Sequence, residues 1–376
     1  MRVVQVNCVQ DPARRKGAEL LDAWPTLLSV ASAVSSAGAE VSVVQSARGG
    51  GSCERDGVAF HFVTDSRFDP LATASGPLRV AQAVKTLQPD VVHVNGLGFP
   101  FHTRLLCSLG APVLVQDHAD NPNSRLGALR RWGLAKVAGA TFTSVEQALP
   151  FFRNKWLKPE VRIFSVPESS TDFGDGDVEQ ARRKTGLYGN PVVLWIGHLN
   201  ENKGPLTILQ AFSQAMGRLP DPHLWLCYKD APLLGRVSAR LAANPKLASR
   251  VHLLGPVPHE TVERLCRAAD FFMLGSRRES CGYALLEALA CGATPIVSDI
   301  PAFRALTANG AVGALCQPGE ARPFASALVS LAGGSIEALR AKAICHFQSE
   351  LSFPVLGKKL LAAYEQLADM PGNKAR

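Results

Sequence analysis

The chain has 376 residues, 47% of them hydrophobic and 19% charged, which predicts a globular protein and excludes disordered, collagen-like and coiled-coil chains. Its net charge of +8 favours anionic partners such as nucleotides, phosphates or acidic lipids, although a generally basic surface explains the charge equally well. The nine cysteines form no CxxC pair, and no segment reads as a secretory signal or a membrane span, so we expect a cytoplasmic protein without disulfides or structural zinc.

Short β-branched runs alternate with amphipathic stretches along the first half of the chain. The runs predicted as strands cover residues 2–8, 40–45, 58–63, 91–94, 112–116 and 162–166. The stretches predicted as helices cover residues 19–37, 77–87 and 125–136. Such alternation is typical of βαβ units.

The second half has the same rhythm. Strands are predicted at residues 192–196, 223–227, 251–254, 271–274, 294–297 and 313–316. Helices are predicted at residues 205–219, 233–243, 259–268, 284–290, 323–331 and 353–367.

About a dozen strands are too many for one ordinary sheet, so the sequence predicts an α/β protein with two doubly wound, Rossmann-like domains. The polar, glycine-rich stretch near 168–177 is the predicted linker, which gives domains at 1–168 and 169–352. We expect the C-terminal helix and tail at 353–376 to pack back toward the first domain. Ligands of parallel sheets bind beyond the carboxyl ends of the strands, so two facing sheets should hold a ligand in the cleft between the domains.

The first candidate loop follows the strand at 192–196. Gly197 permits a sharp turn and the close approach of a ligand, and Pro205 suits the first turn of a helix. His198 and Lys203 would face an anion at this helix start. Taken alone, the segment is equally an ordinary strand-to-helix turn with an exposed lysine.

The second candidate loop follows the strand at 271–274. Glu279 precedes a predicted helix start at Gly282, and Glu287 lies inside that helix. Backbone N–H groups at a helix start suit a diphosphate, and a carboxylate accepts hydrogen bonds from the paired hydroxyls of a sugar or a ribose. The spacing alone also fits two surface glutamates on a capped helix.

Together, in this order, the two loops resemble retaining glycosyltransferases of the GT-B fold, most closely glycosyltransferase family 4. The first reads G-H-L-N-E-N-K-G at 197–204, where the family has G-R-L-x-x-x-K-G. The second reads E-S-C-G-Y-A-L-L-E at 279–287, where the family has E-x-G-F-G-x-x-x-x-E, and A-C-G-A-T-P-I-V-S-D follows at 290–299. The resemblance is strongest over 192–305.

This resemblance implies a C-terminal domain that binds the nucleotide-sugar donor, with Gly197 and His198 near the diphosphate. Glu279 would hold hydroxyls of the transferred sugar, and Lys203 would neutralise the diphosphate leaving group. Glu287 would bind the ribose. Backbone groups would contact the sugar and phosphate at Cys281, Gly282 and Tyr283.

The implied activity is transfer of a hexose from a UDP-, GDP- or other nucleoside diphosphate sugar, with retention of the anomeric configuration. The acceptor would be a sugar, a glycolipid or a small molecule. The resemblance implies no cofactor and no metal, because a lysine and a helix start can stabilise the departing diphosphate without magnesium.

Two departures from the family pattern lie in these loops. His198 stands where the family has arginine, and a histidine is only half-charged near pH 6.5. The diphosphate contact is therefore weaker or pH-dependent, or Arg277 or Arg278 compensates for the lost charge. The aromatic residue between the two glycines of the family motif is absent, because E-S-C-G-Y at 279–283 replaces E-G-F-G-x, and this would reshape the sugar pocket.

The N-terminal half contains weaker candidates for site residues. His118 follows the strand at 112–116, and the resemblance implies a histidine beside the donor sugar at this place. The resemblance implies two glycines near the acceptor and the diphosphate in the first loop, of which only Gly17 remains, so Gly17 is assigned to the acceptor side. Asn95 and Gly96 follow another strand and are assigned to the same side. The basic run at 14–16 either meets an anionic acceptor or is simply solvated.

The helix at 125–136 carries basic residues and Trp132, which fits either ordinary packing against a core or peripheral contact with the inner face of a membrane. A GT-B sugar-nucleotide epimerase or hydrolase is the alternative enzyme, and a catalytically silent nucleotide-sugar-binding scaffold is the alternative outside enzymes. No nucleic-acid-binding motif is present, so we expect no nucleic-acid partner.

Overall fold

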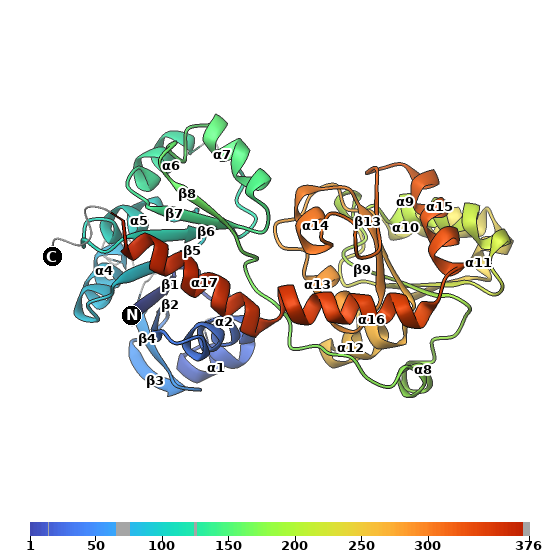
Figure 1. The fold of residues 1–376 in the computed structure, drawn as a ribbon, viewed down its shortest axis with the longest axis horizontal. Helices are drawn as coiled ribbons and strands as arrows, with labels where there is room; N and C mark the ends of the chain where they lie inside the picture. Colours follow the sequence, from blue (N-terminus) through green and yellow to red (C-terminus); the bar gives the residue numbers. More distant parts are fainter. Residues whose placement is uncertain (14, 65–75, 124–125, 371–376) are drawn as a thin grey trace. The chain divides into compact units, whose positions relative to one another are not determined.

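A computed structural model describes residues 1–376 except 14, 65–75, 124–125 and 371–376 (Figure 1). The chain forms two compact units. Unit 1 comprises Met1–Ser170 and the C-terminal segment that begins at Phe353, and unit 2 comprises Thr171–Ser352. The predicted boundary between the domains, at 168–169, lies two residues before the end of the first segment.

The sheet of unit 1 has the strand order β3-β4-β2-β1-β5-β6-β7-β8, and every neighbouring pair is parallel except β3 and β4. The strands are β1 (Arg2–Asn7), β2 (Glu40–Ala47), β3 (Gly51–Arg55), β4 (Val58–Thr64), β5 (Val91–Asn95), β6 (Val113–Gln116), β7 (Gly139–Phe142) and β8 (Arg162–Ser165). Most are buried and rich in valine, as expected for strands covered on both faces.

Helices cover both faces of this sheet, and each face has its own core. One face packs against α1 (Gly17–Ala23), α2 (Pro25–Ser36) and α17 (Phe353–Ala368). The other packs against α4 (Gly76–Thr86), α5 (Pro100–Leu106), α6 (Gly127–Leu134) and α7 (Leu149–Arg153). The C-terminal helix α17 thus belongs to unit 1, as drawn in red in Figure 1.

One prediction for unit 1 was wrong in detail, and several elements were not predicted, among them the short helices α5 and α7. The predicted helix at 19–37 is two helices, because the chain breaks at Trp24 before Pro25, whose ring removes a backbone donor and starts α2. Strands β3 and β7 were not predicted. Their sequences, GSCER and GATF, have no β-branched run, and sheet pairing with a neighbour determines their conformation.

Unit 2 has a parallel six-stranded sheet in the order β11-β10-β9-β12-β13-β14. Its strands are β9 (Val192–Ile196), β10 (His223–Cys227), β11 (Val251–Gly255), β12 (Phe271–Leu274), β13 (Thr294–Ser298) and β14 (Ala314–Cys316). All six were predicted from the sequence, with ends within one residue of the prediction.

The α-helices of unit 2 pack around this sheet in one continuous apolar core. They are α8 (Val178–Thr185), α9 (Pro205–Ala215), α10 (Leu234–Ala242), α11 (Pro245–Ala248), α12 (His259–Ala268), α13 (Tyr283–Ala290), α14 (Pro301–Leu306), α15 (Ala321–Ala332) and α16 (Ile336–His346). Among the described residues of both units, no helix is long and apolar enough to cross a membrane.

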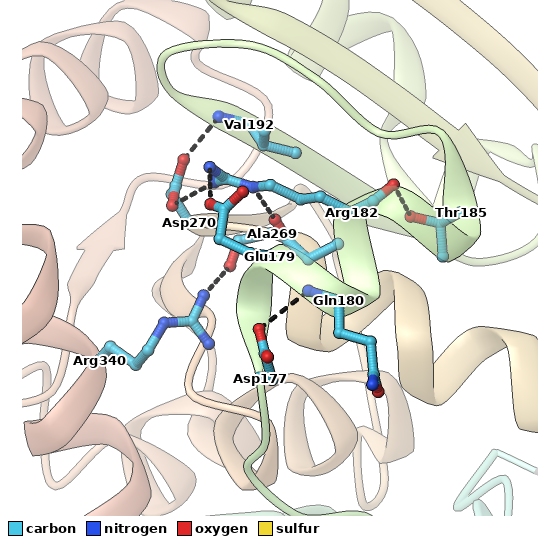
Figure 2. A network of polar contacts seen from close by, with 10 residues as sticks. Asp177, Glu179, Gln180, Arg182, Thr185, Val192, Ala269, Asp270 and Arg340 are labelled. Atoms are coloured by element: carbon cyan, nitrogen blue, oxygen red, sulfur yellow. Dashed lines mark hydrogen bonds and ion pairs between the residues drawn. The ribbon is translucent and has the colours of Figure 1, made fainter.

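A polar network ties α8 to the amino ends of the central strands (Figure 2). Asp270, just before β12, accepts a hydrogen bond from the Val192 backbone at 2.8 Å and from Arg182 of α8 at 2.8 Å. Burial raises the pKa of Asp270, against the opposing effect of these partners. Because the network lies at the amino ends, it anchors the helix and leaves the carboxyl ends of the strands for a ligand.

Candidate functional site

The two loops singled out in the sequence meet at the carboxyl ends of β9 and β12, which are neighbours in the sheet of unit 2. Lys203 Nζ donates a hydrogen bond to Glu279 Oε1 over 2.6 Å. The two side chains are only 19% and 10% exposed. A charge-assisted bond in such a partly desolvated place is stronger than a surface ion pair. The loops therefore present one cation and one anion together.

Glycine makes this approach possible. Gly204 has a φ of +61°, and a Cβ added to it would lie 2.3 Å from the carbonyl oxygen of Gly275. Both the backbone conformation and the clash exclude other residues. The backbones of the two loops therefore touch directly beside the Lys203–Glu279 pair.

Asn202 joins the same loops and was missed in the sequence. Its carbonyl accepts a hydrogen bond from the Arg277 backbone at 2.8 Å, and its side chain donates to the carbonyl of Arg278 at 2.9 Å. Its Oδ1 also accepts from the backbone N–H of Arg278 at 3.2 Å. One signal in the sequence could have indicated it: an asparagine directly precedes the lysine of a strand-to-helix loop. Asparagine side chains commonly form hydrogen bonds with backbone groups.

Helix α13 begins at Tyr283, and Gly282 before it has a φ of +81° and offers no side-chain cap. A Cβ on Gly282 would lie 2.8 Å from the ring of Phe303, so glycine is again required. Cys281 is buried, whereas Tyr283 is 37% exposed. A helix start of this kind directs backbone N–H groups and the positive end of the helix dipole toward an anion.

Glu287 lies in α13, and its side chain is 13% exposed. Burial raises its pKa to about 7. His259, the first residue of α12, lies beside it, with Nδ1 4.0 Å from Glu287 Oε1. The carboxyl group therefore changes its charge near neutral pH, next to a largely exposed imidazole.

The segment before α8 packs along this edge of unit 2. The Phe173 ring lies 4.7 Å from the ring of His259, centroid to centroid. Gly174 fixes the segment, because its carbonyl accepts from Arg267 at 2.8 Å and its N–H donates to Glu263 at 3.3 Å. Sequence reasoning missed Phe173 and His259, because an aromatic residue in a predicted linker and a histidine at a helix start carry no motif.

The first loop of unit 2 turns at Gly197, whose N–H donates to the carbonyl of Cys227 at 3.1 Å. His198 is about half exposed, and its Nδ1 lies 3.0 Å from Asp230 Oδ2. The side chain at the position of the family arginine thus faces a carboxylate. Arg277 and Arg278, named as alternatives to it, are both exposed.

In unit 1, five polar residues lie in one register row across the carboxyl ends of the strands. In the order of the sheet they are Gln45, Asn7, Asn95, Gln116 and Thr141. All except the half-buried Asn95 are buried, and the Asn7 amide donates to Gln45 Oε1 at 2.9 Å. This register row therefore consists of neutral hydrogen-bonding groups.

His118 follows this row, with Nε2 3.2 Å from Gln116 Oε1 and Nδ1 3.8 Å from Glu168. Partial burial lowers the pKa of His118, while Asp120 opposes the shift. Burial raises the pKa of the neighbouring Asp117 to about 7. His118 therefore favours its neutral form at physiological pH.

The remaining acceptor-side candidates also lie in unit 1. Gly96 follows β5 with a φ of +101°, and its N–H donates to the carbonyl of Gln116 at 2.9 Å. Gly17 starts α1 with a φ of +47° and has no atom within 4 Å of an added Cβ. In the basic run, Arg15 pairs with Asp11 at 3.2 Å, and residue 14 lies outside the described residues.

The structure thus brings Lys203 and Glu279 into contact beside Gly197 and the start of α13, with Glu287 farther along the same helix. His118, Asn95, Gly96 and Gly17 belong to the other unit. Over the described residues, no group of three or more His, Cys, Asp or Glu side chains is arranged to hold a metal ion. The site in unit 2 can bind an anion next to a hydroxyl-bearing ligand.

Comparison with known families finds two matching regions. Residues 190–333 match the family described as Glycosyl transferases group 1, and residues 25–147 match Glycosyltransferase Family 4. Among individual relatives, the D-inositol 3-phosphate glycosyltransferase of Nocardia farcinica is 32% identical over 180 residues, which are 46% of this chain and 40% of the relative. The chain thus spans less than half the length of that relative.

Another relative is the GDP-mannose:cellobiosyl-diphosphopolyprenol alpha-mannosyltransferase of Xanthomonas oryzae, 29% identical over 60% of each chain. Among solved structures, HepE of Anabaena in complex with UDP matches 97% of this chain and all of its own, with a TM-score of 0.72 and 16% identity. Sucrose-phosphate synthase of Thermosynechococcus elongatus matches 98% of this chain and 99% of its own, with a TM-score of 0.67 and 17% identity. The predicted GT-B fold is confirmed by these likenesses.

Proposed function

The chain belongs to glycosyltransferase family 4, and from this membership we propose that it transfers a hexose from a nucleoside diphosphate sugar to an acceptor hydroxyl, with retention. The observation that carries the proposal is the ion pair of Lys203 and Glu279 at the carboxyl ends of β9 and β12. The pair places a cation that can neutralise a diphosphate 2.6 Å from a carboxylate that can accept hydrogen bonds from sugar hydroxyls.

The chemistry follows from these charges. The bond between the anomeric carbon and the diphosphate oxygen breaks, a bond to the acceptor oxygen forms on the same face, and the acceptor proton is released. Negative charge grows on the departing diphosphate, where Lys203 and the start of α13 stabilise it. Glu279 accepts hydrogen bonds from the hydroxyls of the transferred sugar. We propose that the reaction needs no metal ion, so activity should persist in EDTA.

Glu287 is the proposed ribose ligand. Its carboxyl group accepts hydrogen bonds from both ribose hydroxyls when ionised, and His259 and Phe173 line its neighbourhood. The UDP of the HepE structure and the GDP-mannose of the mannosyltransferase support UDP- and GDP-sugars as the donors to test first.

Unit 1 is the proposed acceptor unit. The neutral row that includes Asn95 and Gln116 suits the hydroxyl groups of a sugar, glycolipid or other small molecule. We propose that His118, neutral at physiological pH, acts on the transferred sugar. We also propose that unit 1 makes peripheral contact with a membrane.

A thermal-shift panel of UDP-, GDP-, ADP- and TDP-sugars tests the proposal, because a ligand that binds only the folded chain raises its melting temperature. We expect one donor class to stabilise the protein. Glu287→Ala should weaken that binding, Glu279→Ala should abolish transfer, and Glu260→Ala, an exposed glutamate of α12, should change neither. Donor binding and turnover that are unchanged in both site variants would exclude the assigned site.

A further inference from the structure

Three neighbouring helices of unit 1, α4, α5 and α6, expose apolar side chains on one face of the molecule. They cover the same face of the sheet, and α5 packs against both of the others. Of the ten exposed large hydrophobic residues in the described part of the chain, four belong to α4 and α5 or lie on or just before α6. They are Leu78 at 59%, Phe101 at 52%, Leu126 at 58% and Trp132 at 44% exposed. Scattered surface hydrophobics are ordinary, but a gathering on adjacent helices indicates a binding surface.

The packing of α5 on α6 pairs two of these side chains. A Cβ on Gly133 would lie 2.4 Å from Pro100 Cα, so only glycine permits this contact. The close approach places Phe101 and Trp132 in an edge-to-face arrangement, with ring centroids 5.6 Å apart. The pair is therefore fixed in position while both rings remain exposed to solvent.

The same helices carry only positive charge. Their sequences, GPLRVAQAVKT, PFHTRLL and GALRRWGL, contain no aspartate or glutamate. Arg104 lies over Trp132, with its guanidinium carbon 5.6 Å from the ring centroid. The other exposed basic side chains of these helices are Arg79 and Lys85 on α4 and Arg131 on α6, with Lys136 just after α6. Arg130 is different, because it pairs with Asp120 at 2.9 Å.

We propose that this face, the α4–α6 surface, docks unit 1 on an anionic membrane. Exposed aromatic rings with an apolar body sit well at the level of lipid headgroups, and the surrounding cations attract anionic lipids. The helices have 11, 7 and 8 residues, so binding comes from side chains at the interface and needs no inserted helix. The proposal names a partner for the proposed transferase and would place its acceptor unit at a lipid surface.

Co-sedimentation of the full chain with vesicles tests the α4–α6 surface. The protein should bind vesicles of phosphatidylcholine mixed with phosphatidylglycerol, bind phosphatidylcholine alone weakly, and dissociate as salt rises. Phe101→Ser with Trp132→Ser should weaken binding at least about tenfold. Arg104→Gln with Arg131→Gln and Lys136→Gln should weaken it by about fivefold for each charge removed.

Two sets of controls separate docking from general effects. Arg218→Gln with Arg240→Gln and Lys246→Gln removes the same charge from exposed positions of unit 2 and should leave binding unchanged. Arg104→Lys with Arg131→Lys keeps the charge and should also keep binding. The melting temperature of each variant identifies those that fail to fold, and for these the dependence of wild-type binding on lipid charge and on salt remains the test.

Several outcomes would overturn the proposal. The wild-type chain could fail to bind anionic vesicles, or the Phe101→Ser, Trp132→Ser variant could bind them as tightly as the wild type. The unit 2 control could also lose as much binding as the variant with three charges removed from the α4–α6 surface. A dimer in light scattering that the aromatic variant converts to a monomer would identify the surface as a protein interface instead. Vesicle binding needs no donor and transfer to a soluble acceptor needs no vesicle, so failure of this proposal is distinguishable from failure of the proposed function.

Discussion

The carboxyl ends of the two sheets are built from different chemistry. In unit 2 the loops are held together by backbone contact at Gly204 and present an ionised pair, Lys203 and Glu279. In unit 1 the corresponding row consists of amides and a hydroxyl, among them Asn95 and Gln116. An ionised pair suits a diphosphate, whereas a row of neutral side chains suits hydroxyl groups.

The difference shows how one type of sheet serves two kinds of ligand. A partly buried ion pair stabilises developing charge strongly, while each neutral hydrogen bond contributes about 0.5–1.5 kcal/mol. Changes at the edge of unit 2 should therefore reduce activity far more than changes at the edge of unit 1.

The largest expected effect is that of Lys203→Met. Removing a group that stabilises leaving-group charge should reduce kcat by about 10²–10³-fold. Steady-state transfer assays with saturating donor measure it. Lys229→Met, an exposed lysine of the same unit, is the matched control and should retain full activity.

The Lys203→Met change also leaves Glu279 partly buried without its cation, which would destabilise the fold. The double variant Lys203→Met with Glu279→Gln should recover the melting temperature but not the activity. Recovery of both would show that the pair is structural only.

Gly204→Ala should have the next largest effect, on stability. The positive φ alone costs about 1–2 kcal/mol for alanine, and the contact with Gly275 adds to it, for a total of about 2–3 kcal/mol. Gly186→Ala is the control, because Gly186 has a φ of +73° but no atom within 4 Å of an added Cβ. The free energy of unfolding is measured by urea denaturation. An equal decrease in the two variants would show that the contact between Gly204 and Gly275 does not require glycine.

The two units also differ in how far the sequence predicted them. In unit 2 the strands were valine- and leucine-rich runs, and the loops after β9 and β12 carried a spaced family pattern, so both the fold and Lys203, Glu279 and Glu287 could be predicted. The assigned roles of these three residues stay predictions. Asn202 was missed because its function is to bond the backbone of a loop 76 residues away, which no local pattern records.

Unit 1 was harder to predict for a physical reason. Its polar row takes one residue from each of five strands, so it exists only once the register is set. Asn7, Gln45 and Gln116 appear in the sequence as isolated polar residues in or at the ends of apolar strands. Strand β7 was missed because tertiary pairing outweighs its weak propensity. A sequence therefore reveals a site carried by one or two loops more readily than one assembled across a sheet.

A smaller effect is expected from pH, through Glu287. Its pKa of about 7 means that donor binding, which needs the ionised form, should strengthen about tenfold from pH 6 to pH 8. Calorimetry with an intact nucleotide-sugar avoids the titration of a terminal phosphate. Glu287→Gln should abolish this pH dependence of donor affinity, whereas Glu260→Gln, at an exposed position of α12, should leave it. A pH-independent wild-type affinity would contradict the ribose assignment.

Glu287 also makes the stability of the fold depend on pH, in the opposite direction from donor binding. Because burial raises the folded-state pKa of Glu287, its contribution to stability is present below the unfolded pKa and is lost as pH rises through about 7. The melting temperature of the ligand-free protein should therefore decrease less between pH 5 and pH 8 in Glu287→Gln than in the wild type. An identical pH dependence in both would show that the carboxyl group is not buried in the free protein.

The smallest expected effect tests the neutral edge. Asn95→Ala removes one uncharged hydrogen-bonding group, so KM for the acceptor should increase about 2–10-fold while KM for the donor and kcat stay close to wild type. Gln82→Ala removes an exposed amide from α4 and is the control. A large loss of kcat in Asn95→Ala would place this side chain among the groups that stabilise the transition state. An increase confined to the donor KM would move the donor to unit 1, and the contrast between the two sheet edges would then be wrong.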